Sequence, residues 1–255
     1  MNVDSPDTIE RLQRERDFHN QRFTDDGRAA QEKYYFACSK GSASFDDQVR
    51  DLSRDADVLE YGCAKGDTSF DLAPVCSTIT GIDISDVAIS VATEQAGQRG
   101  LANTRFLAMN AEQMTFPDAS FDLVFGRGII HHLDVDRSLS EISRVLRPGG
   151  KALFWEPLGH NPVINGYRRT TPDARTADEH PLLRPDFDTV RKHFDGLDLT
   201  FYGLTTLATV PIRERFFGKR ALDVTAALDR ALFTIPGLRW WAWYSLIVLE
   251  RPRTH

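Results

Sequence analysis

Residues 58–73 read VLEYGCAKGDTSFDLA, and this stretch decides the fold. It runs from a short apolar segment through Gly62 and Gly66 into a helix-like pattern. Because glycine has no Cβ, a turn built on it lets another group approach the backbone closely and adopts dihedral angles that other residues avoid. We therefore expect a strand, a tight turn and a helix, with a ligand held against the turn.

The same alternation of short apolar segments and helical segments continues along the chain. Strands are expected at 57–62, 78–85, 104–110, 121–128, 151–157, 197–208 and 240–250. Helices are expected at 5–37, 45–53, 67–76, 86–100, 138–150, 185–194 and 211–235. Strands that alternate with helices predict an α/β fold, with a doubly wound, mostly parallel sheet and right-handed crossovers.

Composition limits the class of protein. The 255 residues are 41% hydrophobic and 27% charged, which is typical of a soluble globular protein. A net charge of −6 argues against bulk nucleic-acid binding. Three cysteines fit neither a zinc site nor a disulfide framework, and no signal peptide opens the chain, so a cytoplasmic location is expected. The longest apolar run, 240–249, is too short to form a transmembrane helix.

The polar residues around the turn indicate which ligand it holds. Asp83 ends the second expected strand, 21 positions after Gly62, where a carboxylate accepts both hydroxyls of a ribose. The spacing of Gly62 and Gly66 does not match the dinucleotide fingerprint G-x-G-x-x-G. Glu60 precedes the turn, and its charge is unfavourable beside a pyrophosphate but favourable beside an ammonium group. These features favour S-adenosylmethionine.

Five ordered motifs resemble those of the class I S-adenosylmethionine-dependent methyltransferases of the small-molecule type. They are LEYGCAKG (59–66), GIDIS (81–85), the two motifs within NAEQMTFPDASFDLVFGRGIIHHL (110–133), and LRPGGKALFWEP (146–157). The resemblance is good over roughly residues 55–157 and loose elsewhere. It departs from the family at Ala64, where the family has glycine, and at Asn110, where the family usually has aspartate.

The resemblance implies a Rossmann-like sheet of seven strands in the order 3-2-1-4-5-7-6 with the seventh antiparallel. It also implies one domain over 1–255: a helical lid (1–54), a cofactor-binding core (55–157), and substrate-cap insertions with the last strands (158–255). The implied cofactor contacts are Tyr35, Glu60, Gly62, Cys63, Gly66, Asp83, Ile84, Asn110, Ala111, Glu112 and Arg127.

The resemblance also places His131 and His132 at the methyl-transfer site. His132 is the preferred general base and His131 the second choice; the alternative is that one caps a helix while the other packs in a polar core. Expected substrate contacts are Tyr34, which otherwise packs a lid helix, and His160, Arg168 and His180 in the insertion after 157, whose charges otherwise form a solvated loop face.

The function implied is transfer of a methyl group to an oxygen or nitrogen of a small molecule, with S-adenosylhomocysteine as product. One alternative is a nicotinamide-dependent reductase, which the glycine spacing and the missing Tyr-x-x-x-Lys pair disfavour. Another is a non-catalytic protein that binds an adenosyl ligand. The expected partner is a small-molecule acceptor, without a metal or nucleic acid, and a homodimer is compatible with the sequence.

Overall fold

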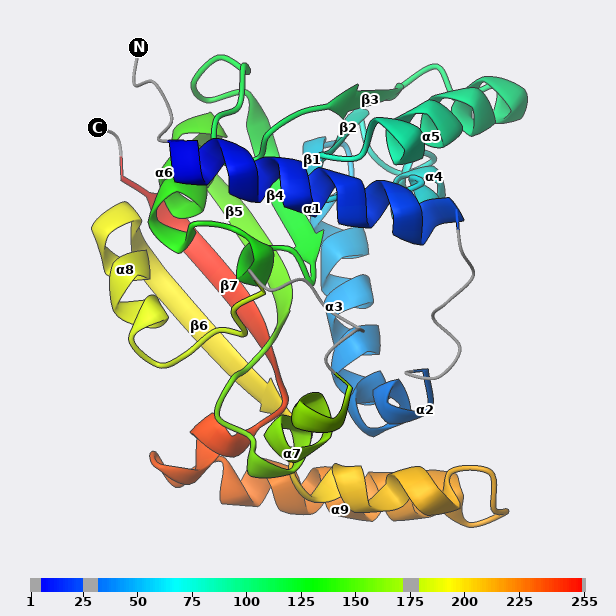
Figure 1. Cartoon of the computed structure of the whole chain (residues 1–255), viewed down its shortest axis with the longest axis vertical. Coiled ribbons are helices and arrows are strands. Elements are labelled where there is room, and N and C mark those ends of the chain that lie inside the picture. Colours follow the sequence, from blue (N-terminus) through cyan, green and yellow to red (C-terminus); the bar gives the residue numbers. More distant parts are fainter. Residues whose placement is uncertain (1–5, 25–31, 172–178, 254–255) are drawn as a thin grey trace.

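The computed structural model describes residues 6–24, 32–171 and 179–253, which contain a seven-stranded sheet (Figure 1). The strands are β1 (Asp57–Tyr61), β2 (Thr78–Asp83), β3 (Thr104–Ala108), β4 (Phe121–Arg127), β5 (Leu146–Pro157), β6 (Phe194–Tyr202) and β7 (Tyr244–Pro252). Their order is β3-β2-β1-β4-β5-β7-β6; β7 is antiparallel to β5 and β6, whereas the other pairs are parallel. The predicted fold class and strand order are confirmed.

Helices connect the strands and cover both faces of the sheet. The α-helices are α1 (Pro6–Thr24), α2 (Glu32–Tyr35), α3 (Ser39–Leu52), α4 (Asp67–Leu72), α5 (Asp86–Arg99), α6 (Val135–Val145), α7 (Pro162–Thr170), α8 (Asp186–His193) and α9 (Gly218–Leu232). The short 3-10 helices are η1 (Phe36–Cys38), η2 (Ile130–His132), η4 (Thr205–Ile212) and η5 (Leu238–Trp241). The expected helix over 5–37 is present as α1 and α2, and 25–31 lie outside the described residues.

Several predicted boundaries are wrong, each for a local reason. The helix expected over 138–150 ends at Val145 because Leu146 is already extended, so Pro148 does not terminate it. The strand expected over 197–208 ends at Tyr202, since Gly203 has a φ of +86° and η4 follows. The last strand begins at Tyr244 rather than 240, after the turn of η5.

Each central strand buries side chains on both of its faces, as expected for a sheet covered by helices on both sides. On β4, Val124 packs in the layer that contains α6 and α8. Its neighbours Leu123 and Phe125 pack in the layer that contains α3 and α4. A smaller cluster around Phe106 joins α5 to β3. The core therefore consists of two layers, separated by the sheet.

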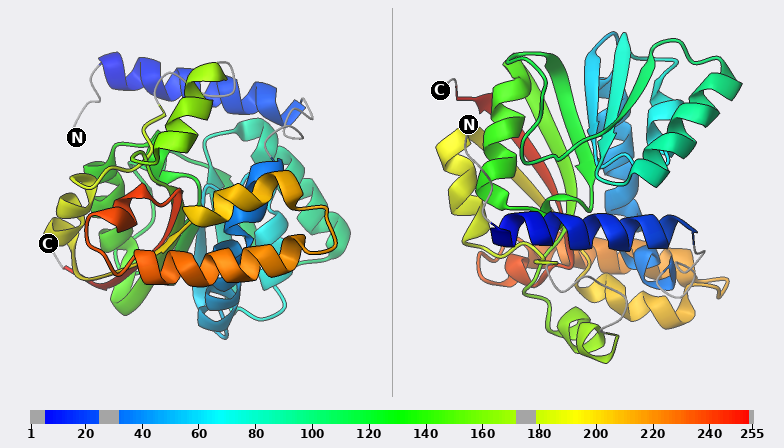
Figure 2. Two further views of the ribbon diagram at one scale, coloured as in Figure 1. Left: turned by 90° about the horizontal axis from the view of Figure 1, so that it is seen from below. Right: turned by 45° about the horizontal axis from the view of Figure 1, so that its top comes forward.

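Helix α1 lies across the edge of the sheet at which the parallel strands end (Figure 2). Arg11 contacts Glu112 after β3 and the carbonyl of His132 after β4. Asn20, nine residues further along the helix, hydrogen-bonds to Ser85 and Asp86 after β2. The helix is thus fixed at both ends over the place where ligands bind in open α/β sheets.

The antiparallel side of the sheet carries α9, which Asp229 attaches to η4. The buried carboxylate of Asp229 accepts hydrogen bonds from the backbone amides of Leu204 and Thr205 and from the Thr206 hydroxyl. This connection fixes the segment after β6 beside the sheet. Within the part of the chain that the structure describes, no helix combines the length and apolar character needed to cross a membrane.

Candidate functional site

The glycine turn between β1 and α4 adopts a left-handed backbone at three of its residues. Gly62, Ala64 and Gly66 have φ angles of +82°, +48° and +84°. A Cβ at Gly62 would lie 2.9 Å from Ile129, and one at Gly66 would lie 2.9 Å from Phe106. The two glycines are therefore required by the backbone and by packing within the protein, in addition to any ligand. Ala64 adopts the same region at a strain cost that glycine would avoid.

Asp83 ends β2 with its carboxylate fixed by two backbone amides. One oxygen accepts from Ala64 N–H and the other from Ser85 N–H, both at 2.9 Å. A carboxylate oxygen has further acceptor capacity beyond one such bond. Asp83 and Ile84 line a large cavity, so the carboxylate is oriented and still able to accept a pair of ligand hydroxyls.

Glu60 lies at the end of β1, almost fully buried, and its carboxylate accepts a hydrogen bond from Ser69. Burial raises the pKa of Glu60 to about 7; hydrogen bonds from Ser69 and Thr68 oppose the rise and the charge of Asp83 adds to it. Cys63 is also buried, and burial raises the pKa of its thiol. Glu60 and Cys63 both line the cavity, where a cation would favour the ionised form of Glu60.

The cavity spans about 1380 Å³ and extends from the glycine turn to η2 and α1. This volume exceeds the roughly 300–1,000 Å³ of a typical small-molecule pocket. Asn110 and Ala111 line it, and the Asn110 side-chain oxygen also accepts from the backbone amide of Glu112. The cavity therefore has room for two ligands side by side.

Glu112 has a different environment from the one that the sequence predicts. Its buried carboxylate accepts two hydrogen bonds from Arg11, at 2.6 and 2.7 Å, and one from the Asp134 amide at 2.8 Å. Among the described residues that line the cavity, Glu112 does not appear. Its side chain joins α1 to the end of the sheet, whereas its neighbours Asn110 and Ala111 line the cavity.

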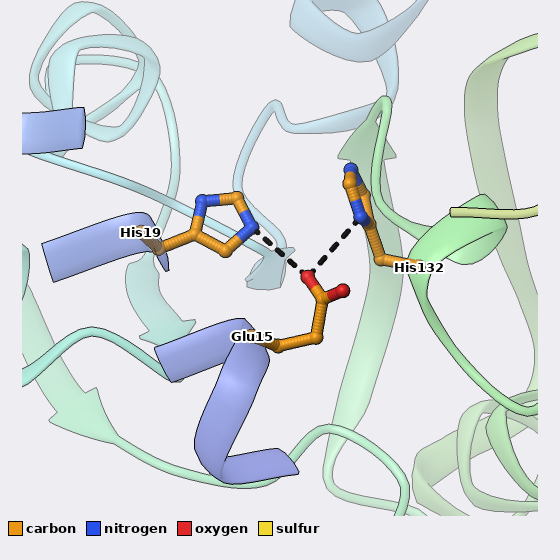
Figure 3. Close-up of side chains that lie close together, drawn as sticks. All are labelled: Glu15, His19 and His132. Carbon is orange, nitrogen blue, oxygen red and sulfur yellow. Dashed lines mark ion pairs between the residues drawn. The ribbon is translucent and has the colours of Figure 1, made fainter. Parts of the chain in front are cut away.

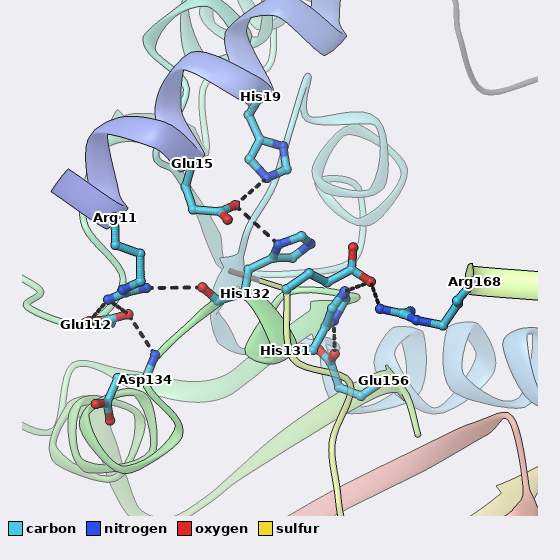
Figure 4. A network of polar contacts seen from close by, with 10 residues as sticks. Arg11, Glu15, His19, Glu112, His131, His132, Asp134, Glu156 and Arg168 are labelled. Atoms are coloured by element: carbon cyan, nitrogen blue, oxygen red, sulfur yellow. Dashed lines mark hydrogen bonds and ion pairs between the residues drawn. The ribbon is translucent and has the colours of Figure 1, made fainter. Parts of the chain in front are cut away.

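His131 is held by a buried carboxylate that the sequence analysis missed. Nδ1 of His131 lies 2.7 Å from Glu156, which also accepts the backbone amides of Ile129 and Ile130 (Figure 4). The two amide donors favour the carboxylate form of Glu156, so we assign the proton of this contact to Nδ1 of His131. The neutral ring then has an acceptor at Nε2, which lies 3.9 Å from Glu179. Both histidines line the cavity, but only the Nδ1 of His131 is hydrogen-bonded to a carboxylate, so His131 is the better candidate to accept a proton from a ligand.

His132 faces helix α1 instead (Figure 3). Its Nδ1 lies 3.3 Å from Glu15, and the same Glu15 oxygen lies 3.5 Å from Nε2 of His19. All three side chains line the cavity. Neither histidine of the His131–His132 pair serves as a helix cap in this arrangement, and both are buried.

Aromatic side chains line another part of the cavity. The Tyr34 ring lies 4.7 Å from that of Tyr167, and Tyr35 stacks on Trp243 with ring centroids 5.8 Å apart. Both tyrosines line the cavity. Arg127 also lines it, but its guanidinium is bound to Ser42 and Asp46 and lies over the Phe45 ring.

The residues predicted in the insertion divide into two groups. Arg168 lines the cavity and forms an ion pair with Glu179 at 2.8 Å. His160 accepts from the amide of Arg184, and His180 pairs with Asp186. Among the described residues these two histidines do not line the cavity, and neither does Gly66. Arg175, a further arginine of the same insertion, lies outside the described residues.

The residues of the site that were not predicted from the sequence include Arg11, Glu15, His19 and Glu156. Two features of the sequence could have indicated three of these residues. Glu15 and His19 are separated by four residues in a helical segment and so lie on one face of it. Glu156 is a charged residue that ends an apolar strand, where an unpaired carboxylate would be costly.

The chain resembles known methyltransferases over its central part. Residues 59–154 match the family model described as a methyltransferase domain. An uncharacterized methyltransferase, YcgJ of Bacillus subtilis, is 35% identical over 112 residues, which is 43% of this chain and 44% of that protein. The chain spans less than half of the length of the curated relatives that it matches.

Solved structures share the fold over most of the chain. Phosphoethanolamine N-methyltransferase 2 of Haemonchus contortus, in complex with S-adenosyl-L-methionine, has a TM-score of 0.65 at 18% identity, covering 93% of this chain and 60% of that one. The [4+2]-cyclase SpnF has a TM-score of 0.57 at 21% identity, with coverages of 84% and 83%. At such identities the likeness shows the fold alone, and this fold supports more than one activity.

Proposed function

We propose that this chain, which carries a class I S-adenosylmethionine-dependent methyltransferase domain, transfers a methyl group to an oxygen or nitrogen of a small-molecule acceptor. The observation that carries the proposal is the cavity: it joins the Asp83 carboxylate at the glycine turn to His131. The fold and the family imply S-adenosylmethionine as cofactor, and it supplies an electrophilic methyl group on a sulfonium.

The residues at the glycine turn fit the parts of that cofactor. Asp83 is fixed by amides and accepts the ribose hydroxyls. Asn110 and Ala111 line the next part of the cavity, beside which an adenine edge can form hydrogen bonds. Glu60 provides a carboxyl group for the ammonium of the methionine part, and that cation offsets the cost of ionising a buried acid.

His131 provides a place for the proton that the acceptor loses. Its Nε2 accepts the proton from an acceptor O–H or N–H, and Glu156 stabilises the resulting imidazolium through Nδ1. Glu156 remains oriented because two amides of the η2 turn bind its other oxygen. General-base assistance of this kind typically contributes about 10²–10⁴-fold in rate.

The remaining walls offer the acceptor aromatic surface. Helix α1 is attached over the strand ends through Arg11, and the aromatic rings of Tyr34, Tyr35 and Trp243 line the cavity. In-line displacement at a methyl group depends mainly on positioning and desolvation, which aromatic side chains beside the acceptor favour. The volume left beside the cofactor supports a small molecule as acceptor.

Calorimetric titration with S-adenosylhomocysteine tests the cofactor assignment. We expect wild-type protein to bind it and Asp83→Ala to bind more than tenfold more weakly, because the variant loses both ribose hydrogen bonds. Asp71→Ala makes the same chemical change on the exposed face of α4 and should bind like wild type. Unchanged affinity in Asp83→Ala would refute the ribose contact; binding of NADH but not of the adenosyl compound would refute the function.

A further inference from the structure

Three metal-ligating side chains from two distant segments meet inside the cavity. Glu15 and His19 lie one turn apart on α1, and His132 projects from η2 after β4 (Figures 3 and 4). One ligand atom from each of the three lies within 4.8 Å of the other two. Glu15 and His132 are buried, and His19 is mostly buried. One carboxylate and two imidazoles form a ligand set typical of catalytic zinc and non-haem iron sites.

The distances fit coordination to a shared cation better than direct hydrogen bonds. Oε2 of Glu15 lies 3.3 Å from Nδ1 of His132 and 3.5 Å from Nε2 of His19. Ligand atoms about 2.1 Å from a tetrahedral ion are about 3.4 Å apart, whereas a charge-assisted hydrogen bond is about 2.7–2.9 Å long. Among the described residues, Nδ1 of His132 has no hydrogen-bond partner although it is buried.

We propose that Glu15, His19 and His132 form a binding site for a divalent first-row transition-metal ion of the Zn²⁺ class. No metal was expected from the sequence, which contains no recognisable metal-ligand motif. Two of the three ligands lie more than 110 residues from the third, so their spacing gives no such motif. The site exists only when α1 is seated on the sheet.

A second set of ligands shares His132 but is less suited to a cation. It consists of His131, His132 and Glu179. Nδ1 of His131 is already bound to Glu156, and its Nε2 lies 3.9 Å from Glu179, longer than a tetrahedral ligand–ligand distance of about 3.4 Å. Arg168 is paired with Glu179 and would repel a metal ion there. The set on α1 is therefore the one assigned.

The three ligands leave an open coordination position on the cavity side, because all of them line it. An ion there would bind an oxygen or nitrogen of the acceptor and make its proton easier to remove. This role rests on the proposed function, but binding of the ion does not, so binding can be measured with no methyl acceptor present. The ion would also tie α1 to η2 and stabilise the folded protein.

Titration of the chelator-treated full chain with Co²⁺ tests the site, because tetrahedral Co²⁺ with nitrogen and carboxylate ligands has intense visible absorption. We expect one equivalent to give this spectrum, and Zn²⁺ to displace it and raise the melting temperature. His19→Ala and Glu15→Gln should each weaken Co²⁺ binding at least tenfold. Glu10→Gln, an exposed carboxylate on the same helix, is the matched control and should bind Co²⁺ like wild type.

The outcomes separate the possible explanations. Loss of Co²⁺ binding in Glu179→Gln with normal binding in Glu15→Gln would overturn the assignment in favour of the second set. A wild-type spectrum no different from that of aqueous Co²⁺ would overturn the metal site altogether, leaving Glu15 as a carboxylate between two imidazoles. Either result leaves the S-adenosylhomocysteine titration unaffected, so the proposed function is tested separately.

Discussion

Glu60 is the penultimate residue of β1, and its carboxyl group is almost completely buried. Because burial raises its pKa to about 7, the group changes charge in the physiological pH range instead of near 4.5. The neighbouring Asp83 adds negative charge, which makes ionisation of Glu60 harder still. The site therefore binds a cationic ligand through a residue whose charge depends on pH.

Cofactor affinity should rise with pH in a way that Glu60 controls. At pH 6 most Glu60 is protonated and neutral; at pH 8 most is a carboxylate, which favours the ligand ammonium. From a pKa near 7 we expect affinity for S-adenosylhomocysteine to be about tenfold higher at pH 8 than at pH 6. Calorimetry at both pH values measures this, and Glu60→Gln should remove the dependence. A Gln variant with the same pH dependence would contradict the assignment.

His131 and Glu156 should act as a unit in turnover. With an acceptor found by screening phenols, amines and glycosides for S-adenosylhomocysteine release, His131→Ala should lower kcat by about 10²-fold or more. Glu156→Gln should lower it less, because the ring remains but loses its ionic partner. Both should bind S-adenosylhomocysteine like wild type. Glu94→Gln on the exposed face of α5 is the control, and equal kcat in all four proteins would remove His131 from the mechanism.

At the scale of elements, α3 approaches the sheet at a glycine. A Cβ on Gly41 would meet the Trp155 ring of β5 and lie 2.6 Å from the Tyr202 ring of β6. In α5, by contrast, Gly97 faces solvent, and nothing lies within 4 Å of a Cβ built there. The two helical glycines therefore have opposite structural reasons for being small.

The same substitution should change stability in opposite directions at these two positions. Gly41→Ala should lower the free energy of unfolding by about 1–3 kcal/mol, because α3 must move away from the aromatic rings. Gly97→Ala should raise it by about 0.5–1 kcal/mol, since alanine favours the helix and meets no neighbour. Urea unfolding measures both. Stabilisation at both sites would show that α3 does not pack as closely as described here.

The contribution of helix α1 to the site could not be predicted from its own sequence. Its mostly charged composition predicts a lid helix with few apolar anchors, and this pattern does not single out Arg11, Glu15 and His19. Arg11 contacts Glu112 and Glu15 contacts His132, each more than 100 positions away in the chain. His19 contacts Glu15 on the same face of α1. Local pattern carries no information about which distant strand ends lie beneath such a helix.

At the scale of the molecule, the sheet could be predicted because its strands are apolar and are followed by turns that contain glycine. The order of the strands then followed from the family resemblance, and the place of Asp83 followed from its distance to Gly62. The different contacts of His131 and His132 could not be predicted, because adjacent side chains point in different directions and Glu156, which binds His131, lies on β5. Boundaries failed where extended and helical segments meet without a break, as at Leu146.

The antiparallel strand β7 has a consequence for synthesis on the ribosome. It lies between β5 and β6, yet it follows both of them in the chain. At about 5–20 residues per second, the roughly 40 residues between β6 and β7 take several seconds to appear. During that interval β5 offers an unpaired, apolar edge, and β6 has no strand to join. The nascent chain is then most exposed to aberrant association, and most in need of a chaperone.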